Sequence, residues 1–198
     1  MNESKSDGSA KVPSARESEL LEAAYGYVLT HGLTDLSLRP LASAIGSSPR
    51  VLLYLFGSKE GLVRALLARA RADELEMLER LRAEHAGADL PVALLAVWGW
   101  LADPARRKLL ALWLETYSRS VSDGDGPWAG FAERTVGDWL ALLEQFQAPG
   151  VRHVPAGIAQ RTLALAILRG GLLDLLATGD PARVDGAIRA QVRLIEPI

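Results

Sequence analysis

The sequence predicts an all-α protein of about nine helices, in which a small head of three helices precedes a larger helical domain. Apolar residues recur at three- and four-residue spacing through most of the chain, which is the period of a helix. Ser, Asp, Pro and Gly divide these stretches at places where helices begin and end. No segment alternates polar and apolar residues as a half-buried strand would, and no internal repeat occurs.

Composition and charge narrow the class of protein. The chain has 198 residues, of which 49% are hydrophobic and 23% charged, as expected of a globular protein with a real core. There is no cysteine, which excludes disulfides and thiol catalysis and fits a cytoplasmic protein. The first residues are polar and lack the apolar core of a signal peptide. The longest apolar run, from Leu90 to Ala102, is too short to cross a bilayer, so we expect no membrane partner.

The head is expected to span residues 14–58 and to begin with a helix that ends near Gly32. Ser37 is a suitable N-cap for a second, short helix, and Pro40 falls in its first turn, where a missing N–H costs little. Gly46 follows the last apolar residue of this helix, at a place where a left-handed backbone favours Gly. A tight turn is therefore expected after the second helix.

A third short helix is predicted to start at Pro49, with Ser48 as its N-cap. Its inward stripe consists of Leu52, Leu55 and Phe56. The residues left facing outward are Arg50, Val51, Leu53 and Tyr54. Two short helices joined by a tight turn bury little apolar surface, and this arrangement is typical of a helix-turn-helix that places its second helix in a groove of DNA.

The region from about Glu19 to Leu67 resembles the N-terminal domain of the tetracycline-repressor (TetR) family of transcriptional regulators. The resemblance rests on three segments, LLEAAYGYVLTHG, SLRPLASAIGSS and LFGSKEGL. The last is similar to the family's recurring F-x-S-K-E-x-L. The match covers about a quarter of the chain closely, and beyond it only length and helical layout agree. The resemblance implies a ligand-responsive regulator, in most cases a repressor, that binds a palindromic operator as a dimer.

One position departs from the family pattern. The family commonly places a phosphate-contacting Tyr directly after the Leu that matches Leu52, and this chain has Leu53 there. Tyr54, one residue later, is the alternative base or phosphate contact. We expect Arg50 and Tyr54 to read base edges, since Arg contacts guanine in a bidentate way. Double-stranded DNA is the expected partner, and the predicted DNA-binding residues are Arg39, Ser47, Ser48, Pro49, Arg50, Val51, Leu53, Tyr54 and Lys59.

The net charge of the chain, −2, gives no basic footprint of the kind that many nucleic-acid binders have. Residues 14–60 contain four Lys and Arg against five Asp and Glu, a balance of 4 − 5 = −1. The acids gather at the start of the first helix, where they suit the helix dipole and can lie away from DNA. An alternative therefore stays open, in which the chain is a helical protein-interaction module whose head does not read DNA.

Residues 59–198 are expected to form a helical domain for effector binding and dimerisation, entered by a long helix from Lys59 to about Glu84. Turn chemistry divides the rest into further helices. They are expected at Leu90–Ala102, from Pro104 to about Val121, from Pro127 through Phe146, at Ala156–Thr178, and around Val184–Ile195.

All five Trp lie in this second domain, after residue 97. Because the resemblance implies an effector site among the C-terminal helices, these aromatics predict a pocket for a small apolar or aromatic effector. The alternative is that they are ordinary core residues. The candidate effector contacts are Trp98, Leu101, Trp113, Tyr117 and Trp139.

The penultimate helix is apolar nearly all round, so it is expected to be buried on both sides. We expect one side to meet a second copy of the chain, with Gly170 and Gly171 permitting close approach. Such a homodimer would place two recognition helices about 34–36 Å apart. The alternative is a central core helix of a monomer. The predicted interface residues are Leu165, Leu168, Leu172, Leu175, Leu176, Ile188, Val192 and Ile195.

The sequence lacks the motifs of the common enzyme classes. It has no Gly-x-Ser-x-Gly, no phosphate-cradling glycine loop and no His-Glu-x-x-His. His85 and His153 are isolated from each other and from carboxylates at the spacing of metal ligands, so neither a metal nor a cofactor is expected. Residues 1–13 are predicted to be a disordered arm, which either brushes a phosphate backbone through Lys5 and Lys11 or has no role.

Overall fold

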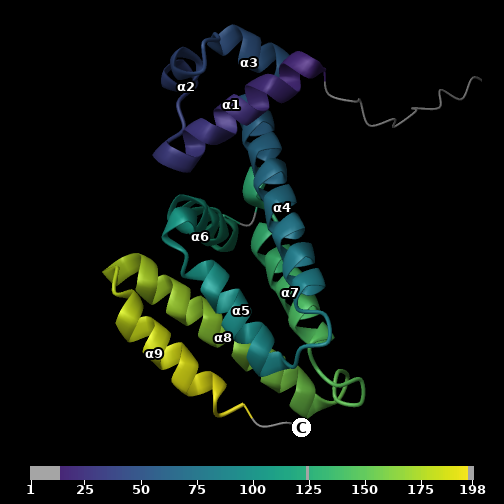
Figure 1. Cartoon of the computed structure of the whole chain (residues 1–198). Helices are drawn as coiled ribbons and strands as arrows, with labels where there is room; N and C mark the ends of the chain where they lie inside the picture. Colours follow the sequence, from purple (N-terminus) through teal and green to yellow (C-terminus); the bar gives the residue numbers. More distant parts are fainter. Residues whose placement is uncertain (1–13, 124, 196–198) are drawn as a thin grey trace, which may run out of the picture.

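A computed structural model describes residues 14–123 and 125–195, and this part of the chain is all-helical, as predicted (Figure 1). It contains nine α-helices and two short 3-10 helices. The α-helices are α1 (Ala15–His31), α2 (Leu38–Ala44), α3 (Pro49–Phe56), α4 (Lys59–Glu84), α5 (Leu90–Leu101), α6 (Arg107–Ser122), α7 (Phe131–Gln145), α8 (Pro155–Thr178) and α9 (Pro181–Val192). The 3-10 helices are η1 (Pro104–Arg106) and η2 (Gly126–Trp128). The predicted arm, 1–13, lies outside the described residues.

Two hydrophobic clusters build the protein. The head cluster joins α1, α2 and α3 to the first turns of α4, around the fully buried Leu41, Leu52 and Leu62. The body cluster holds together α5, α7, α8, α9 and the end of α4. Figure 1 shows α4 running from the head down into the body. Because Leu66 lies in one cluster and Met77 in the other, a single rigid helix connects the two.

Serine caps set the register of the head helices. Ser48 Oγ accepts from the Val51 N–H at 3.3 Å, and Ser58 Oγ accepts from the Gly61 N–H at 3.0 Å. Both bonds satisfy a donor that the first turn of a helix leaves open. Ser37 stands at the N-cap of α2 as predicted, but its side chain makes no capping bond.

Gly61 stands at the second variable position of the F-x-S-K-E-x-L segment, and in this chain it shapes the turn between α3 and α4. A Cβ at this position would lie 2.0 Å from the carbonyl oxygen of Phe56. That distance is far inside van der Waals contact, so the turn between α3 and α4 closes only over a residue without a side chain. The orientation of α3 on α4 thus depends on this glycine.

The segment before α7 differs from the expected single helix. Pro127 and Trp128 belong to η2, and α7 begins only at Phe131, after a turn at Ala129 and Gly130. Trp128 consequently packs against the head cluster, away from the aromatics of the body.

The predicted dimer residues are mostly core, and this corrects the sequence interpretation. Helix α8 packs against α5, α7 and α9 of its own chain. The side chains buried there are Leu165, Leu168, Leu172, Leu175, Ile188 and Val192. Leu176 and Ile195 are half-buried against the same core. The sequence pattern misled because α8 is apolar on every side, so periodicity cannot tell which side its own chain covers.

The uncovered side of α8 is also apolar. Its exposed residues include Leu163, Ala166, Gly170, Leu173 and Ala177. None of the described helices is both long and apolar enough to span a bilayer.

Candidate functional sites

The outer face of α3 is the first candidate site. Leu52 is fully buried and fixes this helix to the head cluster. On the opposite side Val51 and Leu53 are partly exposed, Arg50 is exposed, and Tyr54 is 85% exposed. Figure 1 shows α3 at the end of the molecule that lies farthest from the body helices. The residues predicted to read DNA therefore share one open face.

Three cations surround this face. Arg39, Arg50 and Lys59 are exposed, and none of them forms an ion pair with a described residue. The sequence from residue 36 to residue 59 contains no Asp or Glu. These three cations therefore lie on the surface around α3, with Asp35 and Glu60 as the acids at its edge.

Two acids of α1 are paired with arginines. Glu19 pairs with Arg16 at 2.7 Å, and Glu22 pairs with Arg69 of α4 at 2.5 Å. The acid nearest to the start of α3 is Asp35, which lines the same hollow as Arg39, Pro49 and Lys59.

Ser47 and Ser48, which were predicted to contact DNA, use their side chains differently in the structure. The Ser47 Oγ is buried and has no hydrogen-bond partner among the described residues, so a phosphate contact through this hydroxyl is wrong for the conformation seen. Ser48 uses its Oγ as the N-cap of α3, and Pro49 occupies the first helical position, half-buried. Both residues shape the start of α3, whose backbone N–H groups suit an anion.

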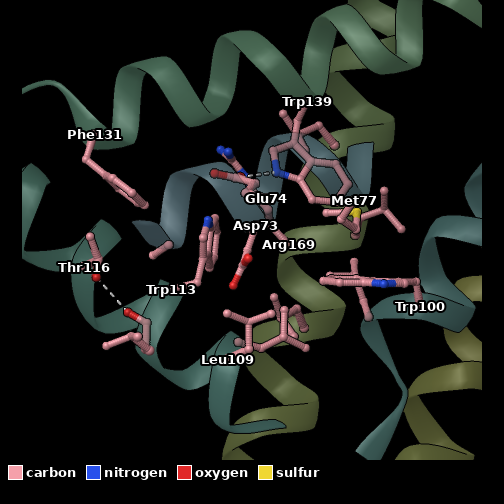
Figure 2. A pocket seen from close by; sticks show the side chains of 17 residues that line it. Asp73, Glu74, Met77, Trp100, Leu109, Trp113, Thr116, Phe131, Trp139 and Arg169 are labelled. Carbon is pink, nitrogen blue, oxygen red and sulfur yellow. Dashed lines mark hydrogen bonds between the residues drawn. The ribbon is translucent and has the colours of Figure 1, made fainter. Parts of the chain in front are cut away.

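The second candidate site is a pocket inside the body, enclosed by α4, α5, α6, α7 and α8 (Figure 2). Its walls are apolar and aromatic, with the rings of Trp100, Trp113, Phe131 and Trp139 around the space. The free volume is about 50 Å³. A drug-sized ligand needs several times this volume, so binding one requires the surrounding helices to move apart.

The structure places three of the five predicted effector residues on this pocket, namely Leu101, Trp113 and Trp139. Trp98 does not line it, because this side chain is buried beside α9 and its Nε1 donates to Asp185 at 3.2 Å. Tyr117 stands behind the wall, where its hydroxyl accepts from Arg169 Nη1 at 3.2 Å.

Sequence reasoning missed several lining residues. These are Asp73, Glu74, Met77, Trp100, Thr116, Phe131 and Arg169, together with further aliphatic side chains. Trp100 was available from the same Trp-rich segment as Trp98. The charged residues carry no sequence signal, because their helices meet only in the fold.

Both carboxylates of the pocket are already paired. Glu74 is buried, and it accepts hydrogen bonds from Trp139 Nε1 at 2.8 Å and from Arg71 Nη1 at 2.7 Å. Asp73 accepts from the Tyr25 hydroxyl at 2.9 Å and pairs with Arg69. Burial, followed by the hydrogen bond to Asp73, raises the pKa of Tyr25, so this hydroxyl remains a donor.

Arg169 is the exception to this pairing. Its guanidinium lies 5.0 Å from the centre of the Tyr117 ring and 5.9 Å from that of Trp113. Its Nε and Nη2 are buried without a hydrogen-bond partner among the described residues. Burial lowers the pKa of Arg169, which still leaves the group charged near neutral pH.

Helix α6 connects the pocket to the head. Trp113 and Thr116 line the pocket, whereas Leu112 belongs to the head cluster. Glu115 accepts hydrogen bonds from the backbone N–H groups of Leu33 and Thr34, in the loop between α1 and α2. A shift of α6 would therefore reach the helix-turn-helix directly.

No group of His, Cys, Asp and Glu suited to a metal ion occurs within the described ranges.

Comparison with known proteins identifies this architecture. No family model matches the sequence, and no curated protein matches it. Among solved structures, a transcriptional regulator from Rhodococcus sp. Rha1 has a TM-score of 0.73 at 22% identity, covering 90% of this chain and 95% of its own. A TetR-family regulator described as putative, from Rhodococcus sp., has a TM-score of 0.70 at 18% identity, covering 92% and 99%.

A third similar structure was solved with a ligand. The multidrug binding protein EbrR in complex with ethidium has a TM-score of 0.67 at 24% identity, covering 91% of this chain and 99% of its own. These likenesses extend over the head and the body together, so the two parts share one known architecture.

Proposed function

We propose that this chain, assigned to the TetR family of transcriptional regulators by its fold and by the motif in its head, is a ligand-responsive repressor that binds a palindromic operator as a homodimer. The observation that carries the proposal is the open face of α3. An 85% exposed tyrosine and Arg50 on a short, well-anchored helix, with Arg39 and Lys59 on the neighbouring helices, form no ion pair within the described residues and suit a polyanionic partner.

The roles on DNA follow from residue chemistry. Arg50 and Tyr54, on the exposed side of α3, would read base edges in the major groove. Arg39 and Lys59 stand near the starts of α2 and α4 and would hold phosphates. Leu53 stands where the family commonly has Tyr, and its side chain cannot form a hydrogen bond. Tyr54 would make this contact to DNA instead.

The uncovered face of α8 supports the homodimer. Its exposed residues from 158 to 177 include Leu163, Gly170 and Leu173, and the carboxylate beside them, Asp174, is paired with Arg183 of α9 at 2.6 Å. Leu194, after α9, is 70% exposed and borders the same groove as Leu163. A largely apolar surface of this length costs free energy in water, and a second copy of α8 and α9 would cover it. This interface replaces the buried residues that the sequence suggested.

The narrow pocket and α6 suggest how an effector could change DNA binding. An effector would have to widen a space of about 50 Å³, which moves α6 relative to the body. Because α6 holds the α1–α2 loop through Glu115, this movement would change the separation of the two heads. Regulation requires only that the effector bind the two arrangements with different affinity.

The alternative is a helical protein-interaction module whose head does not bind DNA. The negative balance of the head supported it in the sequence, and the pairing of Glu19 and Glu22 with arginines weakens that support.

The test is selection of purified protein against random duplex DNA. We expect a palindrome whose half-sites lie about one helical turn apart. Failure to enrich any sequence at low salt, with protein freed of small molecules by refolding, would overturn the proposal.

A further inference from the structure

Arg169 is the one pocket charge that forms no ion pair with a described residue, and Glu74 favours its charge only from a distance. Its Nη1 donates to the Tyr117 hydroxyl at 3.2 Å. Its Nε and Nη2, which form one edge of the guanidinium plane, are buried and make no hydrogen bond within the described part of the chain. An unpaired cation out of water costs free energy, so the position calls for a compensating group.

From this geometry we infer that the pocket binds a flat aromatic ligand carrying a carboxylate, and that the Nε–Nη2 edge of Arg169 holds the carboxylate. Two parallel N–H donors match the two oxygens of a carboxylate in a bidentate pair. The inference rests on the proposed function, since it names the class of effector for that pocket.

The walls define the rest of the ligand. Trp100, Trp113 and Trp139 present aromatic surface on several sides of the space, as Figure 2 shows. Flat rings slide between such walls with the least widening of a narrow pocket. A phosphate would bring extra oxygens and a second charge against these apolar walls, which offer them few donors.

A cationic aromatic ligand is disfavoured by the same contacts. Glu74 already accepts from Trp139 and Arg71, and Asp73 from Tyr25 and Arg69. A cation would therefore find no free carboxylate and would lie beside the charge of Arg169. This distinguishes the pocket from one suited to ethidium, although a structure bound to ethidium shares the fold.

The experiment measures binding of matched probes to the full-length protein without DNA. The probes are benzoate, 2-naphthoate and indole-3-acetate, each with its neutral amide, and ethidium. Tryptophan fluorescence and calorimetry give the affinities. We expect at least one carboxylate to bind about tenfold or more tightly than its amide, because charge-assisted hydrogen bonds are stronger than neutral ones.

Variants assign the preference to Arg169. Arg169→Met should abolish the advantage of carboxylate over amide, and Arg169→Lys should retain only part of it, because Lys lacks the two-donor edge. The matched control is Arg80→Met, an exposed arginine of α4 that should leave the preference unchanged. Equal binding of acid and amide, tighter binding of ethidium, or a preference that survives Arg169→Met would overturn the inference.

The thermal midpoint separates a ligand contact from a structural one. Without ligand, Arg169→Met should unfold at the same or a higher temperature, because it removes a buried unpaired charge. A fall of more than about 5 °C, beyond what 1 kcal/mol produces in a chain this size, would show that Arg169 is needed for the fold and would overturn the ligand role. Binding of a carboxylate that leaves DNA affinity unchanged would instead contradict the proposed regulation alone.

Discussion

The carboxylate of Glu115 on α6 accepts a hydrogen bond from the backbone N–H of Leu33, at 3.0 Å, just beyond the end of α1. The same carboxylate also accepts from Thr34, and a Cβ on the left-handed Gly32 would lie 3.0 Å from its Oε2. A helix of the pocket wall thus holds the loop that leads into the helix-turn-helix. This contact joins the two sites, in addition to the hydrogen bond from Tyr25 to Asp73 of the pocket.

Glu115→Ala should uncouple the pocket from the head. The substitution leaves two backbone donors without their acceptor, which costs about 1–3 kcal/mol of stability. DNA affinity without ligand should change little, while the effect of a bound effector on that affinity should shrink. Calorimetric unfolding and operator binding with and without effector measure the two effects. An undiminished effector response would show that α4 alone carries the signal.

Gly61→Ala should disrupt the head. The added Cβ would lie 2.0 Å from the Phe56 carbonyl oxygen, and a backbone atom cannot move aside cheaply. We expect a loss of at least about 2 kcal/mol of unfolding free energy, as for other overpacked sites, together with loss of DNA binding.

Gly26→Ala is the matched control for Gly61→Ala. Gly26 lies within α1 with no atom within 4 Å of the added Cβ. This change should stabilise the protein by about 0.5–1 kcal/mol, because Ala favours a helix interior. Urea unfolding of both variants provides the comparison, and equal effects of the two substitutions would contradict the account of the α3–α4 turn.

Arg50 and Lys59 should differ in what they contribute to DNA binding. Arg50→Ala should relax base preference at one position of each half-site, since a bidentate contact discriminates by about 1–3 kcal/mol. Lys59→Ala should weaken all sequences alike and reduce the salt slope by about one unit. Competition binding with a set of single-base operator variants distinguishes base reading by Arg50 from phosphate contact by Lys59. Equal loss at every base for Arg50→Ala would remove its reading role.

Leu173→Glu should break the homodimer. Leu173 is 47% exposed on the largely apolar outer side of α8, where a buried, unpaired carboxylate at the symmetric contact would cost several kcal/mol. Sedimentation should show monomers. Leu75→Glu is the control, because Leu75 on α4 is 46% exposed and lies outside the proposed interface. Dissociation by Leu75→Glu, or its absence with Leu173→Glu, would place the interface elsewhere.

The head could be read from the sequence because its signals are local. Ser48, Pro49 and Gly57 start and stop α3 within a few residues of one another, and one face of α3 is apolar. The body could be predicted as helices but not as a packing. Leu168 and Leu173 lie on one apolar helix, and nothing local shows that its own chain buries the first and leaves the second exposed.

The sequence predicted an aromatic pocket in the body, but it identified only some of the residues that line it. Trp98 and Trp100 are two residues apart on α5, so they face different sides, and only Trp100 lines the pocket. Arg169 was missed because the sequence cannot show that its Nε and Nη2 lack hydrogen-bond partners among the described residues. Only the fold shows that Glu74 and Asp73 are engaged by other partners.

Whether the head binds DNA is tested most directly by the salt dependence of duplex DNA binding by the native protein, measured by fluorescence anisotropy. A head that docks unpaired cations from two protomers on phosphates should lose affinity steeply as salt rises, with a slope of about −0.9 for each phosphate neutralised. A logarithmic slope of several units would support the DNA-reading regulator. Absence of binding at low salt, or binding that ignores salt, would contradict it and favour a head that recognises another protein.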